Sequence, residues 1–211
     1  MLITLITGVG VRSLGPLTPE IGALTFFGPR VPALETIALA IHYGFEPLSA
    51  CILTAGVCLV LLLVYRDVLR ALAFGSITAV GWVAAEVGKY TIFRPRPPHG
   101  IVHSVIIETA NDSFPSGHTS FVFSLVCAVV LVLTRPGAKR PLMIAAGTVL
   151  VATVAFSRIY LGLHYPSDVI GSILISTAAL FIWLPIWNRY IHPTFLRITF
   201  PPSLFTPTPR G

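Results

Sequence analysis

Long apolar runs alternate with short polar connections through most of this chain. Five runs come close to the roughly 20 residues that a helix needs to cross the hydrocarbon core of a bilayer. They are Leu48–Tyr65, Ala71–Tyr90, Thr119–Thr134, Leu142–Tyr160 and Val169–Tyr190. The pattern therefore predicts an all-α fold, a polytopic membrane helix bundle with five transmembrane helices. A cryptic sixth span in the N-terminal part remains an open alternative.

The first 47 residues are interrupted by prolines and charges, so we expect no further long span there. Within them, Ala33–Tyr43 has apolar residues at helical spacing and a polar minority, which is typical of a helix in the headgroup plane. The N-terminus lacks leading basic residues and a small-residue cleavage pattern, so no signal peptide is expected. We predict an interfacial segment at 1–47, a transmembrane bundle that carries the chemistry at 48–190, and a proline-rich tail at 191–211, in which the stretch "PPSLFTPTPRG" is expected to be disordered.

Composition narrows the class of protein. The chain of 211 residues is 55% hydrophobic and 10% charged, with a mean hydropathy of +0.85, which is too apolar for an ordinary soluble domain. Lys and Arg outnumber Asp and Glu by 14 to 8, which favours acidic lipids and anionic substrates as partners. The basic residues flank apolar runs instead of covering a soluble surface, so nucleic acid is not an expected partner.

The basic residues also predict how the bundle is oriented. Short loops rich in Lys and Arg stay in the cytoplasm, and three connecting segments carry such residues: Arg66 and Arg70; Arg135, Lys139 and Arg140; Arg189 and Arg197. If these segments share the cytoplasmic side of the plasma membrane, the connections 89–118 and 157–168 meet on the extracytoplasmic side. We expect the active site there.

Those two connections hold several cations at the ends of apolar runs. Lys89, Arg96 and Arg158 could converge at one depth, and guanidinium and ammonium groups together suit phosphate oxygens. The alternative for each is snorkelling to lipid headgroups. Glu86 lies one turn before Lys89 and is expected to pair with it.

The stretch "FPSGHTSFVF" places a histidine at the start of an apolar helix. Pro115 and Ser116 are good helix starters, and Gly117 allows close backbone approach, so unpaired N–H groups at this helix start form a ready anion site. His118 in the first turn could exchange a proton with an oxygen of the bound anion. The alternative is a histidine that only hydrogen-bonds loop backbone.

His164 and Asp168 are one helical turn apart in "HYPSD". If one ring nitrogen of His164 donates to the Asp168 carboxylate, the tautomer is fixed and the other nitrogen can act as a nucleophile. Zinc held by His118, His164 and Asp168 is the competing interpretation, which the neighbouring cations oppose. The three cysteines lie inside apolar runs with no CxxC pattern, so neither a metal site nor redox chemistry is expected.

These residues, in order, resemble the three signature motifs of the type 2 phosphatidic acid phosphatase superfamily, K-x6-RP, PSGH and SR-x5-H-x3-D. The matching residues are Lys89 with Arg96-Pro97, Pro115–His118, and Ser157-Arg158 with His164 and Asp168. The resemblance implies a membrane lipid phosphatase without cofactor or metal. By similarity, His164 attacks phosphorus, Asp168 orients and charge-stabilises it, and His118 protonates the leaving oxygen and activates water. The phosphoryl oxygens would be held by Lys89, Arg96, Ser116, Gly117 and Arg158.

Other features of the chain concern the substrate and the remaining polar residues. Arg94 fits no motif position and would duplicate the phosphate grip or reach lipid headgroups. His99, His103, Glu108 and Asp112 are expected to be solvated or to contact the substrate at the rim. The segment before PSGH is similar to that of undecaprenyl-diphosphate phosphatases, which favours a polyprenyl diphosphate as substrate. Phosphatidylglycerophosphate and phosphatidic acid are the alternatives, and a non-catalytic headgroup-binding or transport protein is the rival class.

Overall fold

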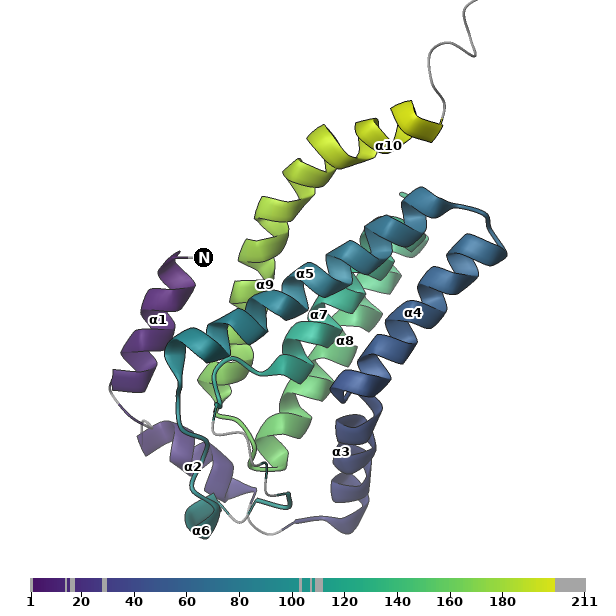
Figure 1. Ribbon diagram of the computed structural model, residues 1–211. Coiled ribbons are helices and arrows are strands. Elements are labelled where there is room, and N and C mark those ends of the chain that lie inside the picture. The colour runs from purple at the N-terminus through teal and green to yellow at the C-terminus, as the bar shows by residue number, and fades with distance from the viewer. Residues whose placement is uncertain are drawn as a thin grey trace, which may run out of the picture.

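The computed structural model describes residues 2–13, 15, 18–27, 30–102, 104–106, 108 and 112–199. Within these residues every regular element is helical, which confirms the predicted all-α class. The long helices lie side by side in a bundle, and the N-terminal helices gather around one end of it (Figure 1).

The bundle is organised around α5 (Val68–Ile92), which packs against its neighbours in sequence and in space. Those neighbours are α4 (Pro47–Leu63), α7 (Gly117–Ala128) and α9 (Pro166–Ile186), and α8 (Lys139–Tyr160) packs against α7. Aromatic and branched side chains from these helices form the main core, including Phe74, Ile77, Phe121, Val122 and Val154. Burial of this apolar surface, together with close packing of small residues, holds the helices together.

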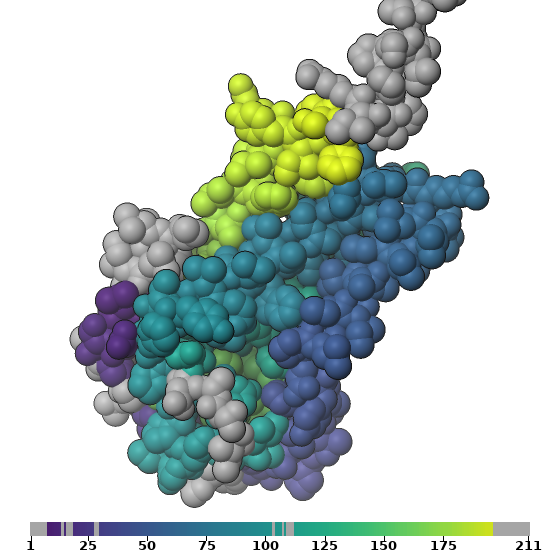
Figure 2. All heavy atoms as spheres, viewed as in Figure 1, coloured from purple at the N-terminus to yellow at the C-terminus, as the bar shows by residue number. Residues whose placement is uncertain are grey.

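Two of the helices continue through π-helical turns. The turn Val129–Leu133 extends α7, and the turn Trp187–Ile191 joins α9 to α10 (His192–Thr199). Pro185 lies just before the second turn and removes one helical hydrogen-bond donor, which explains a local change in winding. The start of α10, in yellow, stands out from the rest of the bundle (Figure 2).

The predicted apolar runs coincide with α4, α5, α7, α8 and α9, but the count of five spans is not confirmed. By length and composition, three described helices can cross a membrane: α5, α8 and Pro166–Phe195. The stretch Gly117–Leu133 is apolar but shorter. A fourth candidate is the pair formed by α3 (Pro32–Gly44) and α4, which bends by 63°.

The bend between α3 and α4 has a local cause. Pro47 is the first residue of α4 and lacks a backbone N–H, while Phe45 and Glu46 leave helical geometry on either side of the break. The helix predicted over Ala33–Tyr43 is thus present as α3. Its position in the headgroup plane stays a prediction.

The N-terminal segment adds two more helices beside the bundle. The first, α1 (Leu2–Ser13), packs against α5 and α9. The second, α2 (Thr18–Phe26), packs against α8, α9 and the short α6 (His99–Val102). Residues 192–199 of the predicted tail are helical, and its proline-rich end, 201–211, lies outside the described residues.

Candidate active site

The structure brings the two predicted extracytoplasmic connections together at one end of the bundle. A pocket of about 400 Å³ is lined there by Lys89, Arg96, Gly117, His118 and His164. The α3–α4 break forms another wall with Phe45 and Pro47, and Trp82 comes from α5. Groups from four parts of the chain therefore face one volume that can hold a phosphoryl group.

Three predicted site residues are buried beside this pocket. Asp168, Ser116 and Arg158 have no exposed surface. Arg158 donates to Nδ1 of His42, 2.8 Å away, and His42 is itself part of the pocket wall. Because Arg158 is fully buried, the snorkelling alternative is wrong for this residue.

His164 lies in the connection between α8 and α9 and is held through its Nδ1 atom. This nitrogen is 2.8 Å from the backbone oxygen of Ser113 and 3.6 Å from Oδ2 of Asp168. A carbonyl only accepts, so Nδ1 carries the proton and donates to Ser113. The predicted approach of the Asp168 carboxylate to this nitrogen is present, and the Ser113 backbone oxygen is a second and nearer acceptor on the same side of the ring.

The other ring nitrogen of His164 keeps its lone pair. Nε2 is 3.4 Å from Nη1 of Arg96, a group that can only donate. Burial lowers the pKa of His164, the charge of Arg96 acts in the same direction, and Asp168 offsets them in part. The imidazole is therefore neutral near pH 7, with Nε2 available as a nucleophile.

Asp168 is held by donors on every side. Its Oδ1 accepts from Arg94 at 2.5 Å, and its Oδ2 accepts from the backbone N–H of Tyr165 at 2.8 Å and from the Ser113 hydroxyl. The bond to Tyr165 forms a capping box at the start of α9, where Pro166 is the first helical residue. The local sequence thus places the carboxylate, and the neighbouring loop completes its contacts.

Ser113 joins these groups although it belongs to none of the three motifs. Its N–H donates to the Arg94 oxygen at 2.8 Å, its carbonyl holds His164 and its hydroxyl holds Asp168. Sequence reasoning missed it, and the available signal was its position two residues before Pro115 of the motif. A loop residue so close to a helix-start motif can orient both partners.

Arg94 is neither a second phosphate grip nor a headgroup anchor, so both expectations for it are wrong. Its side chain is 2% exposed, and its Nη2 is 2.8 Å from Oε2 of Glu20 in α2. The guanidinium also lies 4.0 Å from the centre of the Tyr165 ring. With Asp168 on its other side, Arg94 is a buried cation between two carboxylates.

His118 occupies the first turn of α7 and contacts α3. Its Nε2 donates to the backbone oxygen of His42 at 3.1 Å, which leaves Nδ1 for proton exchange. The imidazole rings of His118 and His42 stack, with their centroids 5.2 Å apart and an angle of 15° between their planes. His118 therefore does hydrogen-bond backbone, as the alternative interpretation had it, and it also lines the pocket.

His42 is a further residue that the sequence pattern did not reveal. It stands in an apolar helical stretch, and its Nε2 is 3.3 Å from the Glu46 carboxylate. Because Arg158 can only donate to Nδ1, the proton of neutral His42 sits on Nε2 and faces Glu46. A histidine one turn before a glutamate at a proline-marked helix break was the signal available.

The two cations in the pocket have carboxylate neighbours. Lys89 Nζ lies 2.9 Å from Glu86 Oε1, which confirms the predicted pair. Arg96 pairs with Glu108 and donates to the Leu163 oxygen at 3.0 Å. Burial raises the pKa of Glu108, but the opposing charge of Arg96 leads the effects that bring it below its usual value. The Glu108 carboxylate is therefore charged, and an incoming phosphate can replace it as the anionic partner of Arg96.

Gly117 lets the charged ends of two side chains approach the backbone closely. A Cβ at this position would lie 3.1 Å from both Lys89 Nζ and Glu86 Oε1. The loop before it is packed in the same way, because a Cβ at Gly171 would lie 2.3 Å from the Phe114 ring. Small residues on α7 and α9 thus let the loop and the cations approach the pocket.

Some loop residues lie at the edge of the site. His99, Glu108 and Asp112 line a neighbouring pocket together with Arg96, and their contact with a substrate stays a prediction. His103 lies outside the described residues. Among the residues that the structure describes, no three His, Cys, Asp or Glu side chains are grouped to hold a metal ion. Metal-free chemistry stays a prediction.

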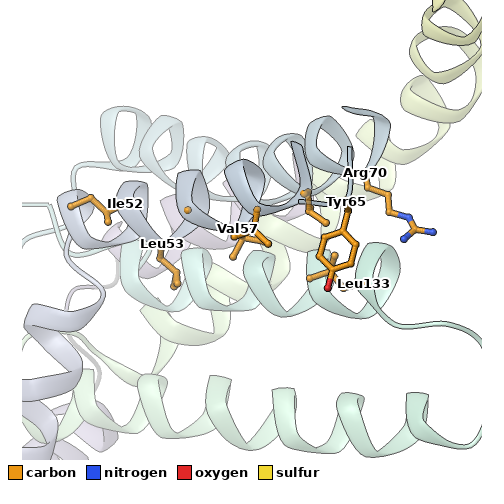
Figure 3. A pocket seen from close by; sticks show the side chains of 9 residues that line it. Ile52, Leu53, Val57, Tyr65, Arg70 and Leu133 are labelled. Carbon is orange, nitrogen blue, oxygen red and sulfur yellow. The ribbon is translucent and has the colours of Figure 1, made fainter. Parts of the chain in front are cut away.

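A separate apolar pocket lies along α4. Ile52, Leu53, Val57 and Leu133 line it, and Tyr65 and Arg70 mark one end (Figure 3). None of the predicted site residues lines this pocket.

Comparison with known proteins gives partial sequence matches. The chain is 34% identical over 99 residues to decaprenylphosphoryl-5-phosphoribose phosphatase of Mycolicibacterium smegmatis, covering 47% of this chain and 50% of that protein. It is 31% identical over 140 residues to an undecaprenyl-diphosphatase of Sulfolobus acidocaldarius, covering 64% and 61% of the two chains. It is 36% identical over 106 residues to undecaprenyl-diphosphatase BcrC of Bacillus subtilis, covering 49% and 51%. The chain thus matches between 50% and 61% of the length of these relatives.

The fold is similar over a longer stretch. A transmembrane PAP2-type phosphatidylglycerolphosphate phosphatase from Bacillus subtilis superposes with a TM-score of 0.74, at 19% sequence identity, over 90% of this chain and 94% of that chain. At this identity the match shows the fold alone. The fold and the apolar helices together are those of a multi-pass membrane protein. The model of the PAP2 superfamily matches residues 70–191, which include the three motifs and more than half of the chain. With motifs, fold and family model in agreement, this chain belongs to the PAP2 superfamily.

Proposed function

We propose that this protein is an integral membrane phosphatase that removes phosphate from a polyprenyl diphosphate through a phosphohistidine on His164. The observation that carries the proposal is the pocket in which the unprotonated Nε2 of His164 adjoins Arg96, with His118 and Lys89 in the same lining. Relatives named as undecaprenyl-diphosphatases support the substrate class. The reaction belongs on the extracytoplasmic side, opposite the basic connections.

In the first step, Nε2 of His164 attacks the terminal phosphorus and the bridging P–O bond breaks. The lipid monophosphate leaves with a proton from Nδ1 of His118, which enters this step as the imidazolium because its Nε2 proton is donated to the His42 oxygen. Lys89, Arg96 and the Gly117 N–H stabilise negative charge on the phosphoryl oxygens. Such electrostatic stabilisation of the transition state accounts for most of the rate enhancement in phosphoryl transfer.

In the second step, His118 accepts a proton from water, and the water oxygen attacks phosphorus. The P–N bond breaks, its electron pair returns to His164 and inorganic phosphate is released. Arg96 moves between two anionic partners during the cycle, Glu108 and the phosphoryl group. Direct phosphate contacts from Ser116 and Arg158 stay predictions, since both side chains are buried beside the pocket.

Phosphate release from purified protein in detergent tests the proposal. With EDTA present, a polyprenyl diphosphate should be hydrolysed at the full rate, and His164→Ala should abolish turnover without loss of the folded helix content. Quenching in alkali should retain phosphate on the protein, whereas acid should release it, since phosphohistidine is acid-labile. A headgroup-binding or transport protein would form no such adduct, and that result would reject an enzyme.

The alternative substrates share the same chemistry. A panel of polyprenyl diphosphate, phosphatidylglycerophosphate and phosphatidic acid, compared by kcat/KM, should rank the prenyl substrate first. A higher value for phosphatidylglycerophosphate would keep the mechanism and replace the substrate, in line with the fold neighbour. No release from any of them would reject the phosphatase function.

A further inference from the structure

A buried ionic cluster lies behind His164. It consists of Glu20, Arg94, Ser167 and Asp168, and none of the first three matches a motif position. Arg94 Nη1 contacts Asp168 Oδ1 at 2.5 Å and Ser167 Oγ at 2.7 Å, while Nη2 contacts Glu20 Oε2 at 2.8 Å. The charged side chains are 2%, 0% and 8% exposed for Arg94, Asp168 and Glu20.

The charge balance of this cluster depends on Glu20. Asp168 and Arg94 alone form a neutral pair, which would present little net charge to the imidazole. Glu20 engages the second Arg94 nitrogen and brings the cluster to a net charge of −1. Because these groups are withdrawn from water, their fields are weakly screened at the neighbouring ring.

The proposed reaction creates a positive charge at that ring. When Nε2 of His164 donates its electron pair to phosphorus, Nδ1 keeps its proton on the Ser113 oxygen, and the ring becomes cationic. When the P–N bond breaks in the second step, the electron pair returns and the ring is neutral again. A fixed negative charge behind Nδ1 therefore stabilises the intermediate more than the resting state.

We propose that Glu20 and Arg94 are positioning residues for the nucleophile. Arg94 keeps Asp168 ionised and fixed, and Glu20 offsets the charge of Arg94 so that the cluster remains anionic toward His164. This inference rests on the phosphohistidine mechanism proposed above. It assigns a part in the chemistry to α2, which lies outside the residues matched by the family model.

A purely structural role for Glu20 makes a different prediction. Its Oε1 also accepts from the N–H of Ser167 at 3.2 Å and from the Ser167 hydroxyl, so it stabilises the start of α9. Glutamine keeps the length of the side chain and an acceptor oxygen but has no charge. Aspartate keeps the charge but is one methylene shorter. If Glu20 serves only as a spacer, Glu20→Gln is the milder change, and if its charge matters, Glu20→Asp is.

Steady-state kinetics with a polyprenyl diphosphate provide the first readout. Glu20→Gln should lower kcat about tenfold, the equivalent of one pKa unit of interaction, and leave KM unchanged because Glu20 does not line the pocket. Glu20→Asp should retain the higher kcat of the two. The control Glu35→Gln removes the same charge from α3, outside the cluster, and should match the wild type.

The pKa of His164 gives a second readout that does not need turnover. It can be followed by NMR of protein with ¹⁵N-labelled histidine, with the signal assigned through His164→Asn. Removing the negative charge of Glu20 disfavours the protonated ring, so Glu20→Gln should lower the pKa of His164. Charged and titratable groups that face this ring or share its pocket stay the same in all variants: Asp168, Arg94, Arg96, Glu108, His118, His42, Lys89, Glu46 and Glu86.

These outcomes separate the inference from the proposed function. An unchanged pKa of His164 in Glu20→Gln, or a Gln variant more active than the Asp variant, would overturn the positioning role. Failure of the wild type to release phosphate from any lipid would overturn the proposed function instead. In that case the NMR titration would still decide whether Glu20 acts on the His164 ring.

Discussion

Replacing Asp168 by asparagine tests how the proposed nucleophile is held. Asp168 Oδ1 accepts from Arg94, while Oδ2 accepts from the Tyr165 N–H and the Ser113 hydroxyl. Asparagine has nearly the same shape but offers one acceptor oxygen and one NH₂ donor. Whichever way the amide turns, its NH₂ faces either the guanidinium or the Tyr165 N–H. One buried donor must lose its acceptor.

The structure sets the size of the effect. Removing one partner of a buried ion pair costs about 3–5 kcal/mol in the free energy of unfolding. Glu20 remains bound to Arg94, so the Asp168→Asn variant should lie near the lower end, about 3 kcal/mol. For catalysis, loss of a fixed group facing a developing charge lowers kcat by about 10²–10³-fold. KM should change little because Asp168 does not line the pocket.

Three measurements check this reasoning: thermal unfolding in detergent, kcat with a polyprenyl diphosphate, and the ¹⁵N shifts of the His164 ring. The Nδ1–H tautomer should persist in Asp168→Asn because the Ser113 oxygen still accepts at 2.8 Å. In serine proteases, where a carboxylate fixes the histidine tautomer, the same substitution costs about 10⁴-fold in kcat. A switch to the Nε2–H tautomer would refute the assignment of Ser113 as the orienting acceptor, and wild-type stability would refute the ionic cluster.

Three further predictions follow from the pocket and its loop. Gly171→Ala places a Cβ 2.3 Å from the Phe114 ring and should lower the free energy of unfolding by about 1–3 kcal/mol, whereas Gly56→Ala, with no atom within 4 Å, should be tolerated in the same thermal melt. Glu108→Gln removes the carboxylate that competes with phosphate, so KM should fall with kcat nearly unchanged, and a higher KM would show that Glu108 binds substrate. Because His164 must be neutral to attack and burial holds its pKa below 6.5, kcat/KM should fall as pH drops through that pKa; an acid limb centred above pH 7 would contradict this.

Much of the site was accessible from the sequence because its determinants are local. The spacing in "HYPSD" puts Asp168 at the third position of α9, where a capping box forms with Tyr165. Ser116 and Gly117 start α7 as the helix-start signals predict, so His118 falls in its first turn. Polar groups at the ends of apolar runs must then share one end of the bundle, whichever way the helices pack.

The contacts that tune these groups depend on long-range register, which no local pattern encodes. His164 Nδ1 and the Ser113 oxygen are 51 positions apart in the chain, and Arg94 and Glu20 are 74 apart. Arg94 and Arg96 illustrate the limit, since both alternate with prolines in "RPRP". Arg96 lines the pocket, whereas Arg94 enters the buried cluster with Glu20 of α2 and Asp168 of α9, and these tertiary contacts distinguish the two residues.

The predicted count of five spans is not confirmed, for a related reason. Hydropathy treats α3 and α4 as separate segments, because Glu46 and Pro47 interrupt the apolar pattern, but the two helices meet the span criterion only as a pair bent by 63°. That break also has a chemical consequence. It directs the His42 carbonyl, in the last turn of α3, toward His118, where the carbonyl accepts from Nε2 of the ring.

Two groups that touch the proposed catalytic machinery therefore come from the N-terminal helices, ahead of the family-matched residues 70–191. The His42 oxygen fixes the tautomer of His118, and Glu20 sets the charge of the cluster behind His164. In the proposed mechanism the three motifs supply the reacting groups, while residues before them adjust how basic those groups are. Chains that share the motifs but differ in these helices should accordingly differ in the pH dependence of kcat before they differ in mechanism.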